Sequence, residues 1–113
     1  MKYIPNKGDI ISLNTYRHPD PSAGNEIMKQ RPALVISRKE FNQHTQFAIV
    51  APITSTKRGM ALEVVLSETF TQGVVLVHQL RSLDVESRGI KFIEKAPNFI
   101  IDQATKMAIV IIK

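Results

Sequence analysis

The chain has 113 residues, of which 43% are hydrophobic and 22% charged; this composition is that of a globular protein and fits a single domain over residues 1–113. It contains no cysteine, which excludes disulfide bonds and thiolate metal sites. The first residues do not form a secretory signal and no apolar run approaches the length of a membrane span, so we expect a soluble, cytoplasmic protein with no membrane partner. The net charge of +5 favours a nucleic acid or an acidic protein as partner.

Short apolar segments bounded by turn residues predict strands along most of the chain. The expected strands cover residues 8–15, 33–37, 46–54, 61–66 and 74–77, with a further strand or a bend at 90–93. Residues 16–30 contain two prolines and show no clean periodicity, so we expect a long functional loop there. Residues 38–45 lack strand alternation and can hold a helical turn.

The C-terminal segment shows a different period. Ile100, Ala104 and then Met107 or Ala108 recur at a spacing of three to four residues, and the spacing continues to Ile111. This pattern predicts a helix that begins after Pro97 and covers the strands. A cluster of short strands without alternating helices favours a mainly β fold with attached helices, a small β-barrel with a C-terminal helix.

The strong catalytic signatures do not occur in this sequence. There is no glycine-rich phosphate-binding loop and no GxSxG elbow around a serine. The three histidines, His18, His44 and His78, are too far apart along the chain for a metal motif such as HExxH. We therefore expect no metal and no cofactor, and we look for polar residues at strand ends.

Arg31 stands at the mouth of an apolar run, next to Pro32. One interpretation is an ion pair with a carboxylate such as Glu26 or Asp9. The other is that a planar, permanently charged guanidinium at a rim binds a phosphate. Thr54 ends another predicted strand, where a hydroxyl either caps a turn or contacts a substrate.

Further polar residues follow these two along the chain. Ser55, Lys57 and Arg58 come directly after Thr54 and place hydroxyls and cations on one patch. We expect the strand over residues 74–77 to continue and to carry His78 on the face opposite Val75 and Val77.

Five segments occur in a characteristic order along the chain. They are residues 8–10 (GDI), 24–26 (GNE), 31–37 (RPALVIS), 52–54 (PIT) and 73–81 (GVVLVHQLR). From about residue 6 to the end, this order resembles the MazF/PemK (Kid) family of bacterial toxin endoribonucleases, and the second-strand and Pro-x-Thr segments are its most specific parts.

The resemblance implies an SH3-like β-barrel that pairs as a homodimer. It implies the toxin of a toxin–antitoxin system, which inhibits translation and growth by metal-independent, sequence-specific cleavage of single-stranded RNA. The 2′-hydroxyl of the RNA would attack the phosphorus and leave a 2′,3′-cyclic phosphate and a 5′-hydroxyl. The implied partner is an antitoxin whose acidic, disordered segment folds into the basic RNA groove.

The resemblance also implies roles for individual residues. The family's catalytic arginine and threonine fall on Arg31 and Thr54, and the loop glutamate falls on Glu26. Kid-type members have an arginine and an aspartate where this chain has Leu76 and His78. The general base is therefore either Glu26 or His78.

Substrate binding is expected from residues on both sides of the groove. These are Tyr16, Arg17 and His18 on one side, and Ser55, Lys57, Arg58 and Gln79 on the other. A gyrase poison on the same barrel, as in CcdB-like toxins, is discounted because that activity relies on a C-terminal tryptophan and this chain has none. The remaining alternative is a non-catalytic barrel that binds RNA or a protein.

Overall fold

The structure is a computed structural model that describes residues 2–20, 25–56, 59, 61–86 and 89–113, with the side chains of residues 15–20 and 25–29 outside the description. The described strands are β1 (Asp9–Asp20), β2 (Asn25–Val35), β3 (Phe47–Thr54), β4 (Glu63–Val65), β5 (Val74–Leu76), β6 (Arg81–Asp84) and β7 (Lys91–Lys95). The helices are α1 (Lys39–Thr45), the 3₁₀ turn η1 (Val77–Gln79) and α2 (Asn98–Ile112).

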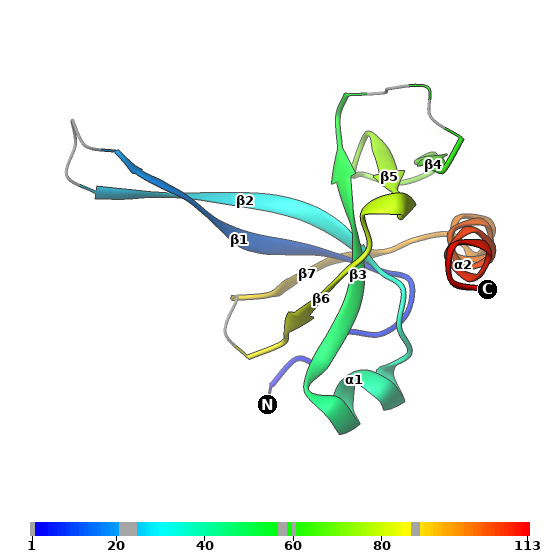
Figure 1. Ribbon diagram of the computed structural model, residues 1–113, viewed down its shortest axis with the longest axis horizontal. Coiled ribbons are helices and arrows are strands. Elements are labelled where there is room, and N and C mark those ends of the chain that lie inside the picture. Colours follow the sequence, from blue (N-terminus) through cyan, green and yellow to red (C-terminus); the bar gives the residue numbers. More distant parts are fainter. Residues whose placement is uncertain (1, 21–24, 57–58, 60, 87–88) are drawn as a thin grey trace.

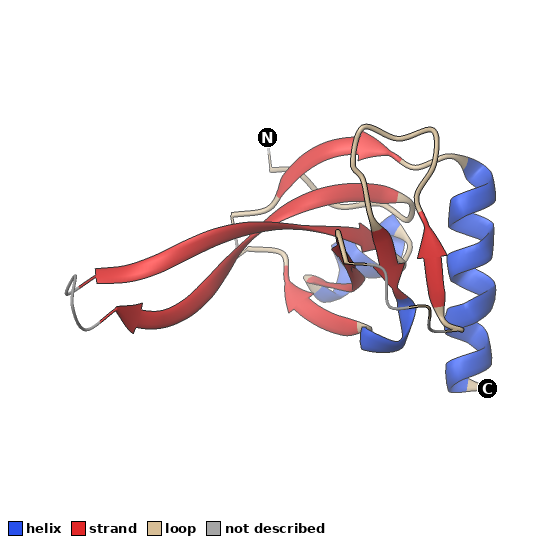
Figure 2. Cartoon of the chain, turned by 90° about the horizontal axis from the view of Figure 1, so that it is seen from above, coloured by secondary structure: helices blue, strands red, loops and turns tan. Residues whose placement is uncertain are grey.

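The strands form one antiparallel sheet in the order β4-β5-β3-β2-β1-β7, with β6 pairing β3 off this path. The sheet bends, and α2 stands along one side of it (Figure 1 and Figure 2). Among the described strands no ladder joins β4 to β7, so the sheet is barrel-like without being closed by hydrogen-bonded strands. The predicted fold class, mainly β with an SH3-like barrel and a C-terminal helix, is confirmed.

Two apolar clusters hold the sheet from opposite sides. The first lies between the sheet and α2 and contains Ile10, Leu34, Ala51, Ile53, Val64, Leu66, Val75, Val77, Ala96, Ile100, Ala104 and Ala108. The second consists of Ile11, Leu13, Ala33, Val35, Ala48, Val50, Leu83 and Val85. The predicted helix is confirmed, since Ile100 and Ala104 are fully buried and Met107 packs against the first cluster. Ile111 was wrongly expected in this interface and is 43% exposed.

The expected loop over residues 16–30 is wrong. Instead β1 and β2 continue as a long two-stranded ribbon that projects from the rest of the molecule (Figure 1 and Figure 2). Only residues 9–12 of β1 pair with β7, and only residues 33–35 of β2 pair with β3. Because no third described strand adds to the outer part of the ribbon, its pairing comes from β1 and β2 alone, and the sequence there carries no clean alternation that would predict two strands.

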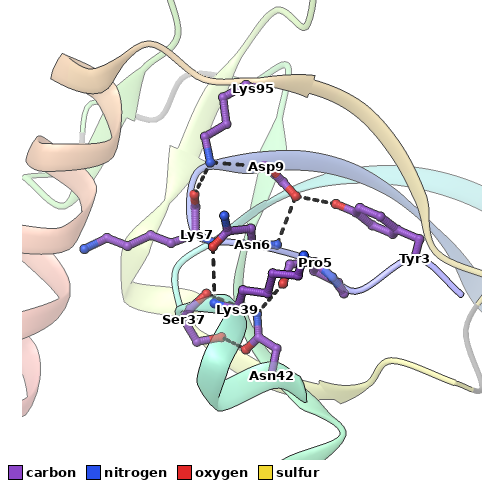
Figure 3. Close-up of polar contacts among 9 residues, drawn as sticks. All are labelled: Tyr3, Pro5, Asn6, Lys7, Asp9, Ser37, Lys39, Asn42 and Lys95. Atoms are coloured by element: carbon purple, nitrogen blue, oxygen red, sulfur yellow. Dashed lines mark hydrogen bonds and ion pairs between the residues drawn. The ribbon is translucent and has the colours of Figure 1, made fainter. Parts of the chain in front are cut away.

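Asp9 is buried at the start of β1 and is satisfied by local partners (Figure 3). Its Oδ2 accepts hydrogen bonds from the Tyr3 hydroxyl at 2.5 Å and the Asn6 backbone N–H at 2.9 Å. Its Oδ1 lies 3.5 Å from Nζ of Lys95 in β7. Burial, and then the hydrogen bond to Asp9, raises the pKa of Tyr3 well above its usual range.

Asn42 of α1 is fully buried and ties the N-terminal segment to the body of the protein (Figure 3). Its Nδ2 donates to the carbonyl oxygen of Pro5 at 2.8 Å and to that of Ser37 at 3.1 Å. The Ser37 hydroxyl donates to Oδ1 of Asn42 and accepts from the backbone N–H of Ile49 in β3. This chain of hydrogen bonds fixes the start of β3 relative to the N-terminus.

The carboxylate of Glu94 joins β7, at one end of the strand order, to the β4–β5 connection at the other end. It accepts the backbone N–H groups of Phe70 and Thr71 at 3.0 and 2.7 Å, and the Thr71 hydroxyl at 2.8 Å. Phe70 and Thr71 lie in the connection between β4 and β5. Burial alone would raise the pKa of Glu94, but the hydrogen bonds from Thr71 and Phe70 outweigh it and lower the pKa.

We predict that Glu94→Ala lowers the free energy of unfolding at neutral pH by about 1–3 kcal/mol, because three donors lose a charged acceptor. The folded-state pKa is lower than the ordinary value of 4.5, so this stabilisation is complete above that value and is lost as the pH falls through the folded-state pKa. Urea unfolding at pH 7 and at acid pH measures it, with Glu40→Ala, an exposed carboxylate of α1, as control. A difference between wild type and Glu94→Ala that persists at acid pH would contradict the prediction.

Candidate active site

The directions of the backbone groups in β3 follow from two hydrogen bonds. Ile36 donates its N–H to the carbonyl oxygen of Ile49, so the even-numbered residues of β2 and the odd-numbered residues of β3 face one another. On the other edge of β3, Val85 donates to the carbonyl oxygen of Gln46, so the even-numbered residues of β3 face β5 and β6.

Pro32 and Pro52 remove one donor from each edge of β3. In the β2–β3 register the pair after Ala33 and Pro52 would be Pro32 and Ile53. Because Pro32 has no N–H to donate to Ile53, the ladder ends with Ala33 and Pro52. Pro52 in turn has no N–H to offer to the edge where β5 gives way to β6. There the segment that follows β5 leaves the ladder and forms η1. The β3–β5 and β3–β6 registers differ by three residues, which is the length of η1.

The registers of three neighbouring ladders, which join four strands, define one row of residues across the sheet. Carried two residues past Ala33, the β2–β3 register sets Arg31 opposite Thr54. Leu13 of β1 pairs with Arg31 on one side, and Val74 of β5 pairs with Thr54 on the other. Arg31 is exposed and Thr54 partly buried, whereas Leu13 and Val74 are buried. A guanidinium and a hydroxyl therefore share one row, with apolar residues on both sides.

Thr54 both closes a turn and keeps a free donor. Its Oγ1 accepts the backbone N–H of Thr56 at 3.2 Å, which confirms the turn-capping interpretation. An accepting hydroxyl still has its own hydrogen to donate. The geometry thus allows Thr54 to cap the turn and to donate to a substrate oxygen at the same time, with the exposed Ser55 beside it.

Gly73 lies against the backbone of Thr54. A Cβ built on Gly73 would stand 2.2 Å from the Thr54 carbonyl oxygen, and its φ of +129° is one that other residues rarely adopt. The sequence reasoning placed Gly73 in a motif without giving it a role. A glycine directly before a predicted strand was the available signal, but its contact with Thr54 depends on a partner far along the chain.

The interpretation of Arg31 as the ion-pair partner of Asp9 is wrong, because Asp9 is bonded to Tyr3, Asn6 and Lys95. Within the described part of the chain no salt bridge involves Arg31. Glu26 lies on β2 and not in a loop, and its side chain is outside the description.

The sequence predicted that the strand over residues 74–77 continues through His78, and this is wrong. His78 lies with Gln79 in η1, which packs against β3 and α2. The missing ladder N–H of Pro52 is the physical reason for this difference. Nδ1 of His78 is buried and has no hydrogen-bond partner among the described residues, and its Nε2 lies 3.5 Å from Nε2 of Gln79. Sequence reasoning left out Arg81, an exposed cation that pairs with Val50 on the same edge of β3.

The remaining predicted binding residues are placed only by their backbone or not at all. Tyr16, Arg17 and His18 lie on β1, where the register shifts by one residue between Tyr16 and Pro19. This is a β-bulge, a feature that often occurs beside functional sites. Lys57 and Arg58 lie outside the described residues.

The described residues contain no group of His, Cys, Asp and Glu side chains that could hold a metal ion. None of the described helices is long and apolar enough to span a membrane.

Known proteins resemble this chain over most of its length. The sequence pattern of the family described as "PemK-like, MazF-like toxin of type II toxin-antitoxin system" matches residues 6–112. The chain is 35% identical over 88 residues to the endoribonuclease toxin MazF of Escherichia coli K12, covering 78% of this chain and 76% of the relative. It is 35% identical over 104 residues to the endoribonuclease toxin ChpB of the same strain, covering 87% and 85% of the two chains. A MazE–MazF crystal structure (Form-II) from Deinococcus radiodurans superposes with a TM-score of 0.83 at 32% identity, covering 98% and 97%.

The fold, the row that contains Arg31 and Thr54, and these matches define the class as toxins of type II toxin–antitoxin systems. Within that class, the chain belongs to the PemK-like, MazF-like toxin family, and the curated relatives above are endoribonucleases.

We predict that Gly73→Ala displaces Thr54 and costs about 2 kcal/mol or more of stability, through a backbone clash and a strained φ. Gly59→Ala is the matched control, because Gly59 also has a positive φ of +69° but no atom of the described residues lies within 4 Å of a built Cβ. That control should show only the conformational cost of about 1–2 kcal/mol. Urea unfolding and the RNA cleavage rate measure both variants. Equal losses in both would mean that the contact with Thr54 is unimportant.

Proposed function

We propose that Arg31 and Thr54 form the cleavage centre of this toxin, which is an endoribonuclease. The observation that carries the proposal is the register of β2 and β3, which sets an exposed cation opposite a hydroxyl donor just beyond the pair at which the ladder ends. A strand edge is rigid, so both groups are held without the entropy cost of ordering a loop.

The substrate is single-stranded RNA, because its 2′-hydroxyl supplies the nucleophile that DNA lacks. The 2′-oxygen attacks the phosphorus and the bond from phosphorus to the 5′-oxygen breaks. The products are a 2′,3′-cyclic phosphate and a 5′-hydroxyl. Arg31 binds the non-bridging oxygens and stabilises the negative charge that grows in the phosphorane, and Thr54 donates a hydrogen bond to one of these oxygens.

Two proton transfers remain, one from the 2′-hydroxyl to a base and one from an acid to the 5′-oxygen. Two residues are candidates, Glu26 and His78, and we assign both proton transfers to His78. Nδ1 of His78 is buried and has no partner among the described residues; an unsatisfied polar group in a native protein needs an explanation, and a catalytic role is one that supports this assignment. An imidazole also has one nitrogen that can accept a proton and one that can donate a proton, and so suits both steps.

RNA binding extends from this row along β3. Arg81 pairs with Val50, four residues before Thr54, or about 13 Å along a strand, so a second exposed cation lies on the opposite edge of β3 from Arg31. Ser55 and Gln79 offer hydrogen bonds near the row, and Tyr16, Arg17, His18, Lys57 and Arg58 complete the proposed set by their place in the sequence. Cleavage by this set requires no metal.

The wider setting of the toxin follows from the family. We propose that residues 1–113 form one toxin domain that pairs as a homodimer in the cytoplasm. Its structural relatives include a MazE–MazF complex, which supports an antitoxin as the natural partner of this chain. An acidic antitoxin segment complements the net charge of +5.

We predict that the protein cuts a long unstructured RNA at a few short sequences in the presence of EDTA. Arg31→Ala and Thr54→Val should each lower the rate about 10²–10³-fold, since each removes a donor to the developing charge. Thr54→Ser should retain most of the activity. The matched controls change the same residue types away from the site: Arg38→Ala directly before α1, and Thr105→Val in α2. Intact RNA with the wild-type protein would leave a binding barrel and overturn the proposed function.

We predict that the cleavage rate of the wild-type protein falls toward acid pH, because His78 must be neutral to accept the proton of the 2′-hydroxyl. His78→Gln should lower the maximal rate about 10²–10⁴-fold and remove the limb that reports the imidazole. His44→Gln, at an exposed position in α1, should leave the profile unchanged. If the profile of His78→Gln matches that of the wild type while Glu26→Gln loses a limb, Glu26 is the base.

A further inference from the structure

The connection between β4 and β5 is held by hydrogen bonds more than by packing. Residues 67–73 are exposed or half-buried, whereas Leu66 before them and Val74 after them are buried. The backbone N–H of Leu66 donates to the carbonyl oxygen of Gly73 at 3.0 Å and closes the connection at its base. Because the connection buries little apolar surface, its position depends on the groups to which it is hydrogen-bonded.

The outer end of the connection is bound by a charged group from the far end of the strand order. Oε1 of Glu94 in β7 accepts the backbone N–H of Phe70, and Oε2 accepts both the N–H and the hydroxyl of Thr71. Hydrogen bonds to a carboxylate are roughly twice as strong as those between neutral groups. Phe70 is 93% exposed, so its ring does not anchor the connection. Since no ladder joins β4 to β7 among the described strands, this carboxylate makes the link that backbone pairing does not.

The inner end of the connection lies against Thr54. Gly73 follows Thr71 by two residues, which reach at most about 7 Å along a chain. A Cβ built on Gly73 would stand 2.2 Å from the carbonyl oxygen of Thr54 and 2.9 Å from its carbonyl carbon, and the next residue, Val74, pairs with Thr54. A shift of the connection therefore moves the backbone that carries the Thr54 hydroxyl.

Glu94 acts on this region from the face of the sheet opposite to the cleavage centre. Glu94 pairs with Ile10, which belongs to the cluster under α2. Arg31 pairs with Leu13, which belongs to the opposite cluster. Paired residues of neighbouring strands share a face, so the Glu94 carboxylate and the Arg31 guanidinium lie on different faces. Any effect of Glu94 on the reaction is thus indirect.

We propose that Glu94 is a positioning residue of the cleavage centre: its carboxylate holds Thr71, and through Gly73 this fixes the place of the Thr54 hydroxyl. The proposal rests on the proposed function, since it names what aligns the same site. The threonine at the end of β3 is then held from two directions, by its own strand and by a carboxylate on the last strand of the sheet.

Kinetics of Glu94→Gln test the proposal on a short fluorescent RNA that contains one of the sites cut in the nuclease assay. Glutamine keeps the size of the side chain but replaces one acceptor oxygen by an NH₂ group, which cannot accept a hydrogen bond. A misplacement of about 1 Å can cost about 100-fold in rate, so kcat should fall roughly 10- to 100-fold. KM should stay nearly unchanged, because Thr54 acts on charge that develops in the transition state.

Ile11→Val is the matched control for lost stability. Ile11 is fully buried in the cluster on the other face, away from the β4–β5 connection, and removal of its methylene group destabilises the fold. This variant should lower the melting temperature without lowering kcat. If kcat falls equally in Ile11→Val and Glu94→Gln, or in neither, the proposal is overturned.

Variants of Thr71 test the path between Glu94 and Thr54. Thr71→Val removes the hydroxyl that donates to Glu94 and should lower kcat several-fold, whereas Thr71→Ser keeps a hydroxyl and should retain the wild-type kcat. The double variant of Thr71→Val and Glu94→Gln should be no slower than Glu94→Gln alone, because both changes remove the same link. Additive losses would show that Glu94 acts by another path and would overturn the proposal.

The pH profile separates positioning from proton transfer. Burial alone would raise the pKa of Glu94, but its hydrogen bonds hold the pKa below the ordinary value of 4.5, so the group stays ionised throughout the neutral range. Glu94→Gln should therefore lower the rate by the same factor at every neutral pH and keep the shape of the profile. A lost limb would make Glu94 a proton-transfer group, which contradicts the proposal.

Amide NMR measures the alignment without any cleavage. The N–H of Thr56 donates to Oγ1 of Thr54 at 3.2 Å, and the N–H of Leu66 donates to Gly73. Both amide signals should shift in Glu94→Gln and keep their wild-type positions in Ile11→Val. Unchanged signals in folded Glu94→Gln would overturn the proposal. A wild-type protein that cuts no RNA would instead overturn the proposed function, while the amide signals still show whether Glu94 positions Thr54.

Discussion

Two missing backbone N–H groups, those of Pro32 and Pro52, shape the site. They lie on opposite edges of β3, where an uninterrupted antiparallel ladder would place a donor. Pro32 ends the pairing of β2 with β3 just before Arg31. Pro52 releases the neighbouring chain into η1, which carries His78. The residues that we assign to the reaction thus lie where the sheet stops being continuous, and their side chains can approach a substrate that a closed ladder would exclude.

A strand that loses partners on both edges must be held by other contacts. Both faces of β3 are buried, since Ala51 and Ile53 belong to the cluster under α2 and Ala48 and Val50 to the opposite cluster. Its start is fixed by the hydrogen bond from Ile49 to the Ser37 hydroxyl. Packing therefore supplies the rigidity that pairing does not, and Thr54 sits at the end of a strand that has little freedom to move.

The sequence predicts the features that depend on local patterns. Apolar runs locate β3 and the buried half of β2, and a helical period locates α2, because each pattern reports burial of a segment against a core. The ribbon over residues 16–30 and the 3₁₀ turn at His78 are not predictable in this way. The first is defined by the pairing of two strands with each other, and the second by a proline 26 residues earlier in the chain, counted from Pro52 to His78. The motif identifies Arg31 and Thr54, but only the register shows that they share a row.

The same proline that opens the site also creates the edge beside it. Once Pro32 stops the ladder, the outward groups of Gln30 and Met28 have no described strand to pair with. An unpaired edge invites strand addition, and natural proteins protect such edges with charge or cover them. Here the residue next to this edge is the exposed cation Arg31, a charge of the kind that discourages the pairing of a further strand. Opening the sheet beside Arg31 and leaving the edge of β2 unpaired are, in this fold, two consequences of one missing hydrogen-bond donor.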